Sequence, residues 1–217
     1  MAKDIHPVLL LPADKPRLSR LLAFALGAAT TLAFAPFGWS LLIPFLILPL
    51  LYICLTIAPR DAAGHAFWYG VGLFLSGTYW IYISVHVYGQ APLWIALLLM
   101  AGLVLLMAAT LSVGGWLISR LSLGEPWLLL LVGPAAWVLV EWVRGWILTG
   151  FPWMAIGYAQ IDTPLAGWAP VLGVYGVSFM LVLSTTAVIA VLKAATPRGR
   201  IAGMAVVLLP WLIGRML

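Results

Sequence analysis

Apolar residues run through this chain in long stretches, and short polar or turn-rich stretches separate them. A helix that crosses the hydrocarbon core of a bilayer needs about 20 such residues. The runs predict about seven transmembrane helices, at approximately residues 21–37, 40–57, 67–87, 92–118, 127–149, 171–192 and 201–217. We therefore expect an all-α membrane protein, a polytopic bundle preceded by a cytoplasmic tail over residues 1–20.

Small residues recur every four positions along the first predicted span: Ala23, Gly27, Thr31 and Ala35. Such a stripe lets a second helix approach closely in a membrane. We interpret it as a structural packing face.

The stretch between residues 150 and 170 differs from the rest because it is both aromatic and rich in turn-forming residues. It is too apolar for a free loop, and its glycines and prolines break it too often for a span. We expect an interfacial or re-entrant segment between spans five and six, lying at the membrane surface.

Composition agrees with a membrane protein, since 65% of residues are hydrophobic, 8% are charged and the mean hydropathy is +1.13. At 217 residues, seven spans leave no room for a soluble domain of ordinary size. The net charge of +5 is scattered between apolar runs without forming a stripe, so it does not indicate a nucleic-acid partner. The single cysteine, Cys54, falls inside a predicted span away from any base, and we expect a buried, unreactive thiol.

Loop charges predict the orientation. With the N-terminus in the cytoplasm, nine of the eleven lysines and arginines fall in cytoplasmic segments, and Arg144 and Arg215 lie toward the outside. This asymmetry follows the positive-inside rule. It places residue 217 in the periplasm, on the same side as the aromatic segment.

An acid and a base lie within one apolar run, at Glu141 and Arg144. If the helix continues to Thr149, these two residues and Leu148 share a face, with Trp142 and Trp146 on the neighbouring one. Two interpretations are about equally supported: an ion pair that fixes span five to its neighbours, or an arginine that meets a lipid phosphate at headgroup level.

Other unusual side chains lie toward the predicted outer side. His86 is interpreted first as a hydrogen-bonded structural residue, although its chemistry suits proton transfer. The aromatic side chains form a membrane-interface belt or a floor for acyl chains or another domain. The candidates for lipid or domain contact are Glu141, Arg144, Trp142, Trp146, Trp153, His86, Tyr79 and Trp80.

No metal or cofactor site is expected. The three histidines fall in separate loops, whereas a metal site needs several ligands close together. Phosphate-loop, dinucleotide, serine-hydrolase and zinc-protease motifs are also lacking from the sequence.

Several segments, taken in order, resemble bacterial apolipoprotein N-acyltransferases. They are AFAPFGW at 33–39, GTYWIYISVHVYG at 77–89, EWVRGWILTGFPW at 141–153, GYAQ at 157–160, PLAGWAP at 164–170 and GVYGVSF at 173–179. The resemblance covers nearly the whole chain from about residue 20, and the segment 141–153 is the most specific part.

The resemblance implies an inner-membrane enzyme of lipoprotein maturation. Family members transfer an acyl chain from a phospholipid to the amino group of the diacylglyceryl-modified first cysteine of an apolipoprotein, through a thioester intermediate. Their Glu-Lys-Cys catalytic set lies in a periplasmic nitrilase-like domain after span seven. This sequence ends at Leu217 and its only cysteine is Cys54, so no position here receives a catalytic role. We predict that the chain alone is inactive and is a truncated or split member, or part of a longer protein.

Two alternatives of a different class remain at this point. A small transporter or channel would need a polar path through the bilayer, and the inner halves of the spans offer almost no polar side chains. A membrane scaffold without catalytic activity is the other.

Overall fold

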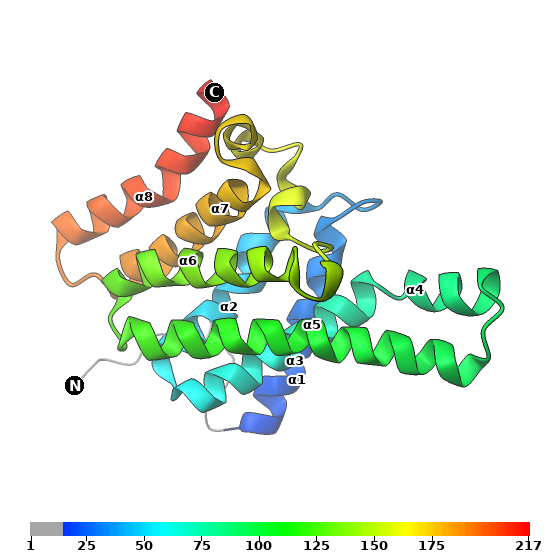
Figure 1. Cartoon of the computed structure of the whole chain (residues 1–217). Helices are drawn as coiled ribbons and strands as arrows, with labels where there is room; N and C mark the ends of the chain where they lie inside the picture. Colours follow the sequence, from blue (N-terminus) through cyan, green and yellow to red (C-terminus); the bar gives the residue numbers. More distant parts are fainter. Residues whose placement is uncertain (1–14) are drawn as a thin grey trace.

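Helices make up all the regular secondary structure between residues 15 and 217, the part of the chain that the computed structural model describes (Figure 1). The α-helices are α1 (Pro16–Thr30), α2 (Ile43–Thr56), α3 (Pro59–Gly77), α4 (Trp80–Tyr82), α5 (Leu93–Ser122), α6 (Pro126–Arg144), α7 (Ala169–Lys193) and α8 (Pro197–Met216). A π-helical stretch, η4 (Ile83–Tyr88), continues α4. The predicted all-α class is confirmed for these residues.

Proline marks the start of most of these helices. It stands in the first turn of α1, α2, α3, α6, α7 and α8. Backbone N–H groups in the first turn of a helix have no partner within the helix, so proline, which lacks an N–H, loses no hydrogen bond there. Its fixed φ angle also suits a helix. Pro44 is therefore a helix start rather than an internal kink of the second span.

Four described helical segments are long and apolar enough to cross a membrane: α5, α6, Pro164–Lys193, which contains α7, and α8. A fifth is added if α3 and the α4–η4 stretch count as one span bent by 48°. The apolar stretch Ser40–Thr56 is shorter, and α1 has 15 residues. These helices support a multi-pass membrane protein, and the count of seven spans stays a prediction.

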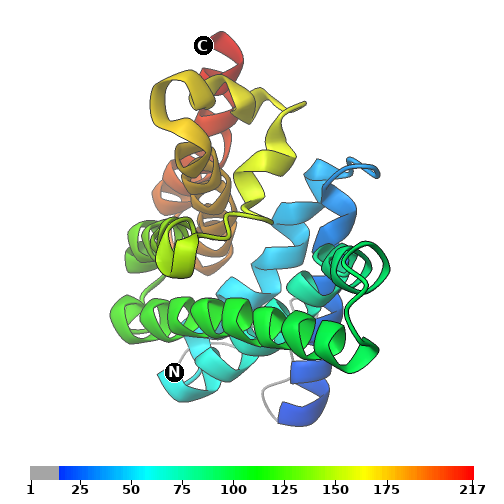
Figure 2. The same ribbon diagram turned by 45° about the vertical axis from the view of Figure 1, so that its right-hand side comes forward.

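From α5 onward, helices that follow one another along the chain pack side by side, whereas α1 packs mainly on α3 rather than on α2. α3 lies between α1 and α5, α6 lies between α5 and α7, and α8 packs on α7 (Figures 1 and 2). The α2 helix contacts five of them: α1, α3, α5, α7 and, less extensively, α6. Beyond this bundle, α4 and η4 extend beside the first part of α5 as a projecting helical hairpin (Figure 1).

The small-residue stripe is where α1 meets α3. A Cβ atom built on Gly27 would overlap the carbonyl oxygen of Tyr69, and one built on Gly72 would overlap that of Phe24. Ala23 is fully buried in the same contact face. The predicted packing face is thus found for Ala23 and Gly27, whereas Ala35 lies beyond the end of the helix.

Two helix boundaries at the start of the chain differ from the expected ones. Helix α1 begins at Pro16, so the last residues of the predicted tail are helical; residues 1–14 lie outside the described residues. Helix α3 begins at Pro59, eight residues before the predicted span, and breaks at Thr78 and Tyr79. At this break the side chain of Met154 lies against Gly77, and the Thr78 hydroxyl donates to the Phe74 carbonyl at 2.6 Å.

The expectation of a continuous helix through Thr149 is wrong. Helix α6 ends at Arg144, and the chain turns back so that the Phe151 N–H donates to the Arg144 carbonyl at 2.7 Å. Leu148, Thr149 and Gly150 all have positive φ angles, outside the right-handed α region, so the helix does not continue through them. Trp146 and Leu148 therefore do not extend the helical face that carries Glu141.

Candidate functional site

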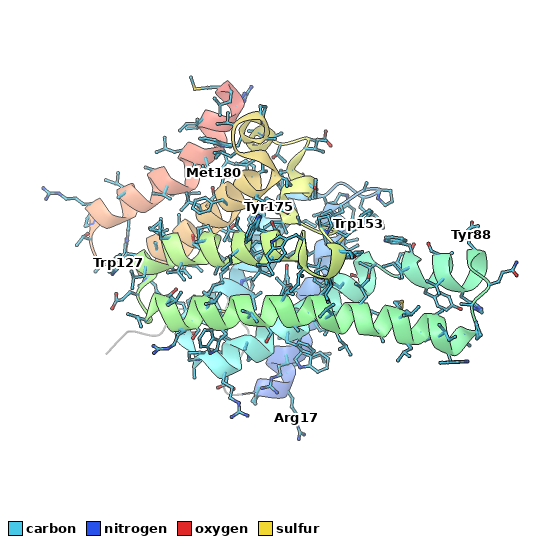
Figure 3. The ribbon with its side chains drawn as sticks, in the orientation of Figure 1. Arg17, Tyr88, Trp127, Trp153, Tyr175 and Met180 are labelled. Atoms are coloured by element: carbon cyan, nitrogen blue, oxygen red, sulfur yellow. The ribbon has the colours of Figure 1, made fainter. Side chains whose placement is uncertain are left out.

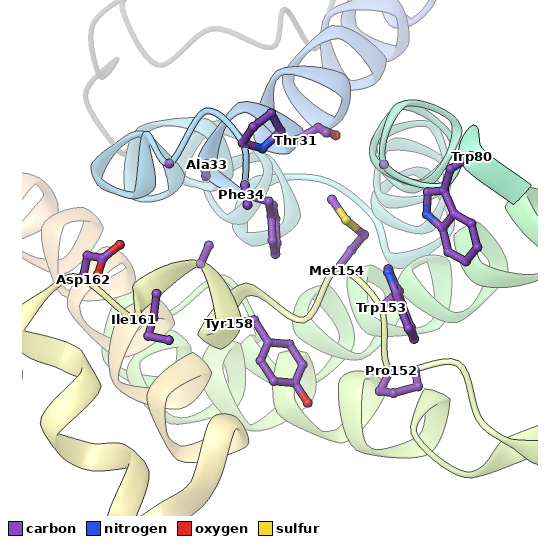
Figure 4. A pocket seen from close by; sticks show the side chains of 15 residues that line it. Thr31, Ala33, Phe34, Trp80, Pro152, Trp153, Met154, Tyr158, Ile161 and Asp162 are labelled. Carbon is purple, nitrogen blue, oxygen red and sulfur yellow. The ribbon is translucent and has the colours of Figure 1, made fainter.

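An apolar cavity of about 740 Å³ opens at the end of the bundle where α1 and α3 finish. This volume lies within the range of about 300–1,000 Å³ that is usual for small-molecule sites. Three parts of the chain form its walls: the turn after α1, the break between α3 and α4, and the segment after α6. Large side chains from all three face one another across it (Figure 4), among them Phe34, Trp80, Trp153, Met154 and Tyr158.

The segment 151–168, which we call the aromatic segment, forms one side of this cavity. It consists of an irregular stretch with a turn at Trp153 and Met154, followed by the 3₁₀ helices η6 (Ile156–Gln160) and η7 (Pro164–Trp168). Trp153 packs on Phe151 and on Trp80, with ring centroids 5.7 Å apart in both pairs. The aromatic segment is thereby joined to the start of α4.

Buried hydrogen bonds fix the aromatic segment to the helices behind it. Its Gly157 N–H donates to the hydroxyl of Ser178 on α7 at 2.9 Å, and the Gln160 side-chain amide donates to the Ser40 carbonyl at 3.3 Å. Met154, Ile156 and Leu165 are buried in the core. The segment is therefore a packed part of the bundle.

Glu141 provides a further anchor for the aromatic segment. Its side chain is 1% exposed, and its Oε1 atom accepts hydrogen bonds from the Trp137 indole and from the Ile156 N–H, both at 2.9 Å. Its Oε2 atom has no hydrogen-bond partner in the part of the chain that the structure describes. Glu141 thus ties the end of α6 to the start of η6.

The ion pair that the sequence suggests does not form. No nitrogen of Arg144 lies within 4.0 Å of a Glu141 oxygen, and the Arg144 Nε atom has no hydrogen-bond partner among the described residues. The guanidinium instead lies over the ring of Phe74, at 4.9 Å from its centroid. Arg144 is 1% exposed, so a lipid headgroup does not reach it in this conformation, and its contact with lipid stays a prediction.

The other predicted residues lie in different places. Trp80 and Trp153 line the cavity, while Tyr79 is exposed beside Trp80. Trp142 and Trp146 pack edge to face, 5.5 Å apart and half exposed, but they do not line the cavity. His86 lies in η4, where its Nδ1 donates to the Ala91 carbonyl at 2.8 Å, a structural contact of the projecting hairpin.

Phe34, Met154, Tyr158 and Asp162 line the cavity but are missing from the predicted set. Their signal in the sequence is only that they lie among glycines and prolines in irregular segments, where no periodicity indicates which side chains face one another. Asp162 is the one charged residue in the cavity lining. Among the described residues, the lining includes no Cys, His or Lys, and its mainly apolar walls can hold an apolar group.

Comparison with known proteins identifies the family. The sequence profile of the apolipoprotein N-acyltransferase N-terminal domain matches residues 26–187. The chain belongs to the apolipoprotein N-acyltransferase family. The predicted resemblance is therefore confirmed.

Individual apolipoprotein N-acyltransferases match most of the chain. The protein of Photobacterium profundum is 42% identical over 171 residues, which are 78% of this chain and 33% of that relative. The protein of Pseudomonas putida is 42% identical over 200 residues, 89% of this chain and 39% of the relative. That of Azotobacter vinelandii is 43% identical over 199 residues, 89% and 38% respectively. The matched part of the chain therefore spans between a third and two-fifths of these relatives.

Proposed function

We propose that this chain forms the membrane part of an apolipoprotein N-acyltransferase and that its cavity receives an acyl chain of the phospholipid donor. The observation that carries the proposal is the cavity itself, with aromatic and aliphatic walls at one end of an apolar helical bundle. A lipid moving in the bilayer can present a hydrocarbon chain to such a cavity, where the chain makes van der Waals contacts with the apolar walls.

Acyl transfer itself would need groups other than those that line the cavity. The only thiol belongs to Cys54, which is 1% exposed in the last turn of α2 among apolar side chains. We therefore propose that residues 1–217 bind lipid without transferring its acyl chain. A periplasmic nitrilase-like domain carrying a Glu-Lys-Cys set would supply the chemistry, and an apolipoprotein would be the acceptor.

The two ends of the bundle carry different charge, and this difference supports the predicted orientation in the membrane. Eight of the ten described lysines and arginines lie at one side of the bundle. At this side α1, α3, α6 and α8 begin and α2, α5 and α7 end. Arg144 and Arg215 belong to the other side, where the cavity opens. The positive-inside rule then places the cavity in the outer half of the inner membrane.

Photocrosslinking tests whether the cavity receives an acyl chain. A phospholipid with a diazirine at the end of one acyl chain is incorporated with the 217-residue chain into nanodiscs and activated, and the labelled peptides are identified by mass spectrometry. We expect labels on residues that line the cavity, chiefly Phe34, Trp153 and Tyr158. Ala35→Trp should remove most of this labelling, because Ala35 is an exposed residue of the lining and an indole would fill the space.

A matched variant controls for the added tryptophan. Leu131 is exposed on α6 and lies outside the cavity, so Leu131→Trp should leave the cavity labels unchanged. Labels spread evenly over the lipid-facing helices, or cavity labels that survive Ala35→Trp, would contradict the proposal.

A further inference from the structure

A second groove lies at the opposite end of α1 and α3 from the cavity. It has a volume of about 400 Å³ and is lined by Arg17, Arg20, Leu21, Phe24 and Trp68. Three of these residues are apolar and two carry a guanidinium group. Leu21 is 63% exposed and Trp68 is 42% exposed, so the apolar walls are open to the surroundings.

The two arginines have no acidic partner among the described residues. No carboxylate oxygen of residues 15–217 lies within 4.0 Å of either guanidinium, although Asp61 stands in the first turn of α3 close to this end. The Nε atom of Arg20 is buried and has no hydrogen-bond partner among residues 15–217. The groove therefore has two features. It carries two positive charges that have no acidic partner in this part of the protein, and its apolar surface is exposed.

The groove is held in shape by a buried contact directly behind it. The Ser19 hydroxyl and the His65 Nε2 share a hydrogen bond of 2.8 Å, and the His65 Nδ1 donates to the Asp61 carbonyl at 2.8 Å. Ser19 and His65 are both buried, and the Arg20 guanidinium lies beside Gly64, which has no side chain to displace it. Arg17 projects outward from the start of α1 (Figure 3). The relative position of α1 and α3, and with it the groove, is thus fixed without a ligand.

We propose that this groove binds an anionic phospholipid, with its phosphate on Arg17 and Arg20 and the upper part of an acyl chain against Leu21, Phe24 and Trp68. A guanidinium group binds phosphate oxygens through two parallel hydrogen bonds. Tryptophan favours the headgroup level of a bilayer, which puts Trp68 at the depth where a phosphate and an acyl chain join. Two uncompensated cations favour a lipid of net negative charge over a zwitterionic one, whose ammonium group they repel.

Native mass spectrometry of the detergent-solubilised 217-residue chain tests this proposal, with phosphatidylglycerol or phosphatidylcholine added at equal concentration. We expect phosphatidylglycerol to be retained in preference to phosphatidylcholine. Arg17→Gln with Arg20→Gln should lower phosphatidylglycerol retention roughly tenfold or more, because each basic residue near an anionic lipid contributes on the order of fivefold. Arg17→Lys with Arg20→Lys should keep part of the preference, since charge remains but the planar fork is lost.

Controls separate this site from charge in general. Arg120→Gln with Arg198→Gln removes the same charge from the same end of the bundle, and both residues are exposed outside the groove, so retention should stay within about twofold. Glycerol 3-phosphate, which has no acyl chain, should not displace the lipid.

The proposal is overturned if the Arg17 and Arg20 variants retain phosphatidylglycerol as the parent chain does, if both lipids are retained equally, or if glycerol 3-phosphate competes. Thermal unfolding of each variant shows whether a loss of binding reflects a loss of fold, and the lysine variant decides the question if the glutamine variant does not fold.

Discussion

At the scale of single residues, the acid and base of α6 have different contact partners. Glu141 accepts two hydrogen bonds that hold the aromatic segment, whereas Arg144 lies against an aromatic ring. Sequence reasoning identified both as unusual because charge is rare in an apolar run. It could not identify their partners, because the Ile156 N–H and the Phe74 ring come from segments whose position depends on the whole fold.

Replacement of Glu141 tests its role as an acceptor. Glu141→Ala leaves the Trp137 and Ile156 donors buried without a partner, and each such donor costs about 1–3 kcal/mol. Glu141→Gln keeps one acceptor oxygen and should destabilise the protein less. We expect the unfolding temperature in detergent to be highest for the parent chain, lower for Glu141→Gln and lowest for Glu141→Ala. Proteolysis should cut the Glu141→Ala variant within the aromatic segment.

The exposed acid Glu125 provides the control, since Glu125→Ala should leave the unfolding temperature nearly unchanged. If Glu141→Gln is as damaging as Glu141→Ala, the negative charge matters rather than hydrogen-bond acceptance, and the account of this residue fails.

At the scale of elements, helix existence was easier to predict than helix ends. Long apolar runs were enough to indicate α5, α7 and α8 to within about four residues of their bounds. The ends of α3 and α6 could not be predicted, because both depend on the aromatic segment: Met154 packs on Gly77 where α3 stops, and Phe151 bonds back to Arg144 where α6 stops. The cavity was missed for the same reason, since it lies between these irregular ends.

The contact between α1 and α3 gives a prediction at this scale. Gly27→Leu places a side chain where the Tyr69 carbonyl now lies, so the helices must separate and the Thr30–Tyr69 hydrogen bond of 2.6 Å is strained. Overpacking of this kind typically costs about 1–3 kcal/mol. We expect a clearly lower unfolding temperature for Gly27→Leu.

Gly102 on α5 offers the matched control, because nothing lies within 4 Å of a Cβ atom built there. Gly102→Leu should unfold at a temperature close to that of the parent. Equal unfolding temperatures for the two leucine variants would show that the close approach of α1 and α3 does not contribute to stability.

At the scale of the whole molecule, the two ends of the bundle differ in chemistry. One end carries most of the lysines and arginines and the groove at Arg17 and Arg20; the other carries the cavity and the aromatic segment. Composition and loop charges were sufficient to predict a membrane protein with this asymmetry. The family resemblance, in contrast, came from specific segments such as 141–153 and not from periodicity.

The central claim is that the cavity end faces the periplasm, and cysteine labelling tests it most directly. In a Cys54→Ser background, Ile161→Cys places a thiol on the exposed rim of the cavity, and Ala195→Cys places one in the exposed turn between α7 and α8. Spheroplasts are treated with a membrane-impermeant maleimide before and after lysis. The account predicts that the thiol at position 161 reacts in intact spheroplasts and the thiol at 195 only after lysis. The reverse pattern would contradict it.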